Sequence, residues 1–144
     1  MEELEALRKM IEEHDYSSAL ALIDEMDEIA KDDKIVKIES FLVVLLVHII
    51  KQQAEKRTTS SWERSIDHAL FSVIKSNKRR SAGGYYLKPE ELQAAIDEVF
   101  SYALKEAAGE AFGGAFSPKQ LLDMINSEQI KAEVLNKILN YELP

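Results

Sequence analysis

Apolar and polar residues alternate with the 3.6-residue period of the α-helix along nearly the whole chain. Residues 2–14 carry one narrow apolar stripe, made of Leu4, Leu7, Met10 and Ile11. A second amphipathic segment covers residues 18–30. Asp32 and Asp33 then offer N-cap side chains for a third helix over about 34–56. The pattern therefore predicts three separate helices in this part of the chain.

Capping residues and prolines divide the remaining sequence. Ser60 or Ser61, with Glu63 as capping-box partner, predicts the start of the next helix. Pro89 and Pro118 each suit the first turn of a helix, where a missing N–H costs nothing. The helices that follow from these signals cover about 60–77, 89–112, 118–126 and 127–139.

The most apolar stretch is Phe41–Ile50, in which only His48 is polar. A membrane span needs roughly 20 apolar residues, and this run has about ten before Lys51. A helix with no clean polar face is otherwise surrounded by neighbouring helices. We therefore expect an all-α fold, a compact bundle of four main helices plus shorter terminal helices around a central buried helix at about 34–56. Residues 1–144 are expected to form one domain, since the length suits one core.

Composition narrows the class of protein further. The chain has no cysteine, which excludes disulfides, thiolate metal sites and thiol nucleophiles and is compatible with a reducing cytoplasm. The N-terminus alternates charges and leucines and does not resemble a signal peptide. We expect a soluble, acidic, cytoplasmic protein that is not embedded in a membrane.

Charge is distributed unevenly along the chain. Residues 1–33 hold 12 acidic and 3 basic side chains, residues 34–88 hold 4 and 11, and residues 89–144 hold 10 and 4. Basic side chains next to aromatic rings suit phosphate contacts and base stacking, although charges at helix C-termini also serve the helix dipole. The candidate binding residues are Lys75, Lys78, Arg79, Arg80, Tyr85, Tyr86 and Lys88.

His48 has two interpretations, a structural histidine in the core or a metal ligand or general base. The Glu-x-x-His motif of di-metal bundles is missing, because Ile11, Leu45 and Ser65 stand three residues before the histidines. Three histidines converging on one ion is the remaining metal arrangement. The sequence also lacks a phosphate-binding loop and a nucleophile elbow. We therefore predict no metal, no cofactor and no catalytic residue.

The segment IESFLVVLLVHIIKQQAEKRTTSSWERSI, residues 38–66, resembles a cyanobacterial family of hypothetical proteins, the domain of unknown function twenty-nine. The shared features are a leucine-rich helix with His48 and Lys51, a polar link, and then Ser61-Trp62 and Ile66. YYLKPEEL and SPKQLL are also similar to a subgroup of that family, so that the resemblance covers about residues 16–122. It implies a small helical bundle of cyanobacterial type with no established activity and no catalytic residues.

Two classes of function follow from these features. The first is a non-enzymatic interaction module that binds a protein partner or a second copy of itself. The alternative is nucleic-acid or phosphate-ligand binding through the basic segment at 75–88.

Overall fold

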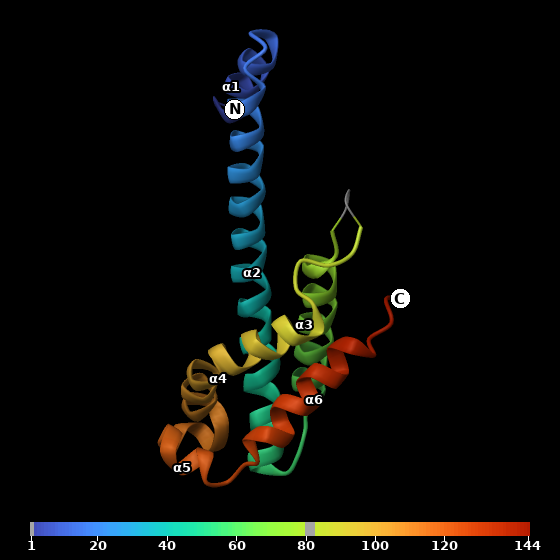
Figure 1. The fold of residues 1–144 in the computed structure, drawn as a ribbon. Helices are drawn as coiled ribbons and strands as arrows, with labels where there is room; N and C mark the ends of the chain where they lie inside the picture. The colour runs from blue at the N-terminus through green and yellow to red at the C-terminus, as the bar shows by residue number, and fades with distance from the viewer. Residues whose placement is uncertain (1, 80–82) are drawn as a thin grey trace. The chain divides into compact units, whose positions relative to one another are not determined.

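The computed structural model describes residues 2–79 and 83–144 (Figure 1). Arg80, one of the candidate binding residues, lies outside the described residues. Within them the fold is all-α, as predicted, and an isolated antiparallel bridge joins Lys78 to Tyr85. The elements are α1 (Glu2–Glu12), α2 (Tyr16–Glu55), α3 (Ser60–Asn77), α4 (Pro89–Glu110), the 3₁₀ turn η1 (Ala111–Gly114), α5 (Pro118–Leu122) and α6 (Ser127–Leu139).

The chain divides into two compact units, Met1–Lys34 and Ile35–Pro144. The predicted break between a second and a third helix is wrong, because α2 continues through Asp32 and Asp33. No proline or glycine interrupts this stretch, and aspartate in a helix costs only a few tenths of a kcal/mol, about 0.7 at most. The carboxylates therefore lie on the exposed surface of one continuous helix. A single domain over 1–144 stays a prediction.

The C-terminal unit is a bundle around the second half of α2. The apolar run is buried as predicted: Leu42, Leu45, Leu46 and Ile50 are shielded from solvent completely. Apolar side chains of α3, α4, α5 and α6 complete the same core cluster. Burying each such side chain is worth roughly 1.5–3 kcal/mol, so this cluster is the main stabilising element of the unit. In the described part of the chain no helix has the length and apolar content of a membrane span.

Most helix starts in the C-terminal unit follow the predicted signals. Ser117 accepts a hydrogen bond from the Gln120 N–H (3.2 Å) and begins α5. At α3 the predicted cap is wrong by one residue, because Thr59 Oγ1 accepts from the Trp62 N–H (3.1 Å). Glu63 does not close a capping box there; its Oε1 accepts from the Thr58 hydroxyl (2.9 Å). Threonine and serine are both common N-cap residues, so the pattern alone does not decide which of several neighbouring hydroxyls caps the helix.

The N-terminal unit consists of α1, a turn and the first part of α2, and we call these residues 2–34 the N-terminal hairpin. His14 turns the chain in a left-handed conformation (φ 61°). The Asp15 N–H donates to the Met10 carbonyl (2.8 Å), which closes the turn. Ala19 is buried, whereas no residue of α1 is. The hairpin therefore covers little of its own apolar surface.

Candidate functional site

The loop between α3 and α4 is held as a tight antiparallel turn by one buried asparagine. Asn77 Oδ1 accepts from the Leu87 N–H (2.7 Å), and Asn77 Nδ2 donates to the Leu87 carbonyl (3.0 Å). The Tyr86 N–H also donates to the Asn77 carbonyl (2.8 Å). Both ends of the loop are thus tied together at its base. We call residues 75–88 the basic loop.

The structure places the predicted binding residues of the basic loop as follows. Lys75, Lys78 and Lys88 are exposed. The Arg79 guanidinium lies over the Tyr86 ring at 5.2 Å, and the Arg79 N–H donates to the Gly84 carbonyl (3.0 Å). That cation–π contact uses one aromatic ring for internal packing. Tyr85, which is 61% exposed, presents its ring to solvent.

A cavity of about 300 Å³ lies at the base of the basic loop. Tyr85 and Leu87 of the loop form part of its lining, together with Pro89 of α4 and Leu139 of α6. Tyr141 completes this lining; burial raises the pKa of the Tyr141 hydroxyl, and the charge and hydrogen bond of Asp67 raise it further. Lys78 and Lys88 are sequence neighbours of the lining residues Asn77, Leu87 and Pro89.

A second cluster, which sequence reasoning missed, surrounds a buried lysine. Lys51 is only 6% exposed, and its Nζ lies 2.9 Å from Glu110 Oε1 and 4.7 Å from the centre of the Trp62 ring. The Arg57 guanidinium lies over the same ring, also at 4.7 Å. The tryptophan therefore packs against two cations. Lys51, a single lysine at the end of an apolar run, was the sequence feature that could have indicated this cluster. Its carboxylate partner Glu110 lies 59 residues further along the chain, so the sequence did not identify the pair.

Glu55 connects this cluster to the turn after α4. Its Oε1 accepts from Arg57 Nε (3.0 Å), and its Oε2 accepts from the Phe112 N–H (3.2 Å). Burial raises the pKa of the Glu55 carboxyl, but the hydrogen bonds from Arg57 and Phe112 and the charges of Arg57 and Lys51 together outweigh burial and lower it. Phe112 itself is left-handed (φ 52°), an uncommon conformation for a side chain of this size. The charged groups of this cluster contact one another, the Trp62 ring or the Phe112 N–H. We therefore call this cluster the polar clamp.

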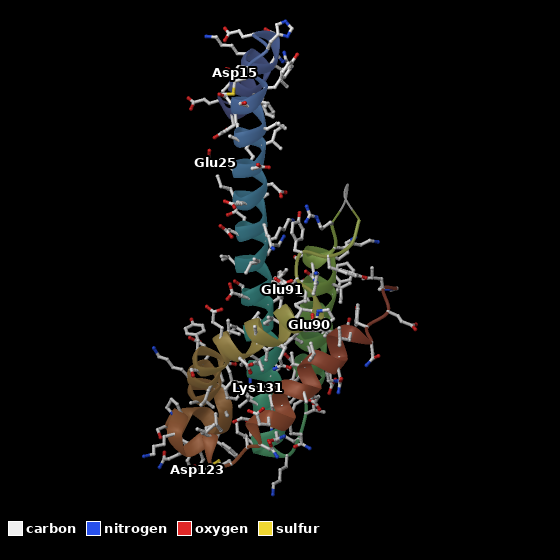
Figure 2. The ribbon with its side chains drawn as sticks, in the orientation of Figure 1. Asp15, Glu25, Glu90, Glu91, Asp123 and Lys131 are labelled. Atoms are coloured by element: carbon white, nitrogen blue, oxygen red, sulfur yellow. The ribbon has the colours of Figure 1, made fainter. Side chains whose placement is uncertain are left out.

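The N-terminal hairpin carries several large apolar side chains that are exposed to solvent. Leu4 (48% exposed) and Ile11 (47%) share the apolar face of α1, where they line a shallow groove together with Leu7, Arg8 and Glu12. Leu20 (63%) is exposed on α2. Figure 2 labels Asp15 at the turn and Glu25 on α2. The groove on α1 has one basic and one acidic side chain in its lining, Arg8 and Glu12.

His48 is half-buried, and its Nδ1–H donates to the Val44 carbonyl one turn earlier (2.8 Å). A hydrogen bond to the backbone of its own helix is the geometry of a structural histidine. In residues 2–79 and 83–144, no three histidine, aspartate or glutamate side chains are arranged to hold a metal ion.

In the described part of the chain the fold is all-α, with a polar clamp around Lys51, exposed apolar side chains on the N-terminal hairpin and exposed lysines on the basic loop. The family described as domain of unknown function DUF29 matches residues 2–124, and the chain belongs to that family. No curated protein and no solved structure matches the chain.

Proposed function

We propose that the protein is a non-enzymatic interaction module whose N-terminal hairpin binds a protein surface. The observation that supports this function is the exposure of Leu4, Ile11 and Leu20 together on one small unit. Contiguous apolar surface bordered by polar residues is typical of protein interaction sites. The hairpin gains buried apolar area only by contact with another surface, since it has scarcely any core of its own. A cytoplasmic setting agrees with the lack of cysteine.

Site-specific photo-crosslinking tests this function. A photoreactive residue is introduced at Leu20 or Ile11 of the full chain in cells that naturally express it. We expect discrete protein crosslinks from both positions, because both side chains would lie within the interface. Glu133, an exposed residue of α6, is the matched control and should give none. Equal crosslinking from Leu20 and Glu133, or no protein crosslink from either hairpin position, would contradict the proposal.

A second candidate is nucleic-acid or phosphate-ligand binding by the basic loop. The sequence between His68 and Pro89 has five basic and no acidic side chains, and Tyr85 is exposed among them. Such binding should weaken steeply with salt and on replacing Arg79 and Arg80 by alanine, whereas Lys137→Ala on α6 should have no effect. A salt-insensitive signal, or one that survives the double replacement, would exclude this candidate.

A further inference from the structure

The two exposed surfaces of this chain have complementary chemistry. The N-terminal hairpin, residues 2–34, holds 12 acidic and 4 basic side chains. Its apolar face needs a partner surface that is both apolar and basic, because an acidic partner would be repelled. The expected partner is therefore a protein surface that combines apolar and basic side chains.

The basic loop and the cavity at its base provide basic and apolar side chains of this kind. Lys78 and Lys88 are exposed, and each is a sequence neighbour of a residue that lines the recess of about 300 Å³, which includes Tyr85 and the half-exposed Leu139. The acidic groups nearest in sequence are Glu90, Glu91 and Glu142, and Asp67 interacts with the Tyr141 hydroxyl at the recess. Glu91 Oε1 already accepts from the Lys88 N–H (3.1 Å) at the start of α4, where Figure 2 labels Glu90 and Glu91.

We propose that the partner of the N-terminal hairpin is a second copy of this chain, with the hairpin of one copy docked on Lys78, Lys88 and the adjoining cavity of the other. This inference rests on the proposed interaction function and assigns its occupant. Leu4 and Ile11 stand seven residues apart, about 10 Å along α1, so two apolar anchors enter the partner's surface from one helix face. The acidic side chains of the hairpin then lie against the lysines of the other copy.

Such a contact joins two different patches, so it is a heterologous interface and not a self-complementary one. Rim charges chiefly set association rate and salt dependence, while apolar anchors in recesses contribute most affinity. Self-association should therefore weaken as salt rises, and it should need both patches.

A charge-exchange experiment tests the pairing with full-length protein. One variant carries Glu12→Lys and Glu13→Lys near the C-terminus of α1, where added lysines suit the helix dipole. The other carries Lys78→Glu and Lys88→Glu. Sedimentation of the wild type should show mass rising with concentration and falling with salt. Each variant alone should associate about tenfold more weakly, and an equimolar mixture should regain association because each copy supplies the complementary patch the other lacks.

Lys105→Glu with Lys119→Glu, two exposed lysines of α4 and α5, changes net charge equally and should leave association unaltered. A wild type that stays monomeric at every concentration, a mixture that stays monomeric, or a control that weakens association equally would overturn the inference. Monomeric protein that still gives crosslinks from Leu20 to a different protein assigns the surface to that protein and retains the proposed function. Monomeric protein without protein crosslinks overturns both.

Discussion

The ion pair between Lys51 and Glu110 offers a prediction in which two replacements at one contact have different effects. Glu110→Ala removes the carboxylate 2.9 Å from a lysine that is almost fully enclosed. Lys51→Met instead replaces the buried ammonium by an apolar side chain of similar length. We expect the first to destabilise the C-terminal unit clearly and the second to change its stability little.

The magnitudes follow from burial. Breaking a fully buried pair costs about 3–5 kcal/mol, because the remaining charge is buried without a partner. Here Glu110 is half-exposed and the Trp62 ring still faces Lys51 Nζ, so water and the ring moderate the loss. Glu110→Ala should therefore cost about 1.5–3 kcal/mol. Lys51→Met loses the ion pair and the cation–π contact. It also removes the cost of burying a charge, so the free energy of unfolding should change by no more than about 1 kcal/mol in either direction.

Urea unfolding followed by far-UV circular dichroism and by Trp62 fluorescence measures both variants and the double variant. Trp62 is the only tryptophan, so its fluorescence reports on the C-terminal unit alone. Glu133→Ala, an exposed site on α6, is the control and should stay within about 0.5 kcal/mol. If Lys51→Met were as costly as Glu110→Ala, the clamp would owe its stability to charge attraction, and the reasoning would be refuted.

Three further predictions concern other contacts. Lys56 is left-handed (φ 55°) just after α2, so Lys56→Gly should raise the free energy of unfolding by about 0.5–1 kcal/mol in urea melts. Asn77→Ala should lower it by about 2–4 kcal/mol, because the buried N–H and carbonyl of Leu87 both lose their partner. The folded-state pKa of Glu55 is lowered, so its contribution to stability is present above the unfolded pKa of about 4.3 and is lost as pH falls through the folded pKa. Glu55→Gln should therefore weaken the loss of stability on acidification, measured by urea melts at several pH values.

The first two of these have a matched control variant. Lys56→Ala keeps the left-handed strain and should stabilise far less than the glycine variant. Asn136→Ala removes an exposed asparagine of α6 and should be nearly neutral. For Glu55→Gln, a loss of stability on acidification equal to that of the wild type would contradict the prediction. For the other two, a neutral Asn77→Ala or a destabilising Lys56→Gly would do so.

Local signals predicted those parts of the fold in which sequence alone decides the backbone. Pro89 and Pro118 begin helices as expected, since their effect needs no distant partner. The break at Asp32 and Asp33 was wrong, because a capping residue marks a helix start only where something also ends the preceding helix. The burial of residues 41–50 was predictable from length and polarity alone.

The functional surfaces were less accessible from sequence. Periodicity identifies which face of α1 is apolar but not whether another helix covers it, so the exposure of Leu4 and Ile11 appears only in the structure. The Lys51–Glu110 pair joins distant positions that no local motif links. By contrast, the charge excess of the basic loop was evident from composition, and the structure adds its cavity and the Asn77 ties.

Hydrogen exchange of the N-terminal hairpin as a function of protein concentration tests the central claim most directly. If the hairpin docks on a second copy, exchange at residues 2–12 should slow as concentration rises from about 1 μM to about 1 mM. The protection should weaken at about 1 M NaCl, where the Debye length is about 3 Å. Exchange rates of α1 that stay the same across both ranges would contradict it.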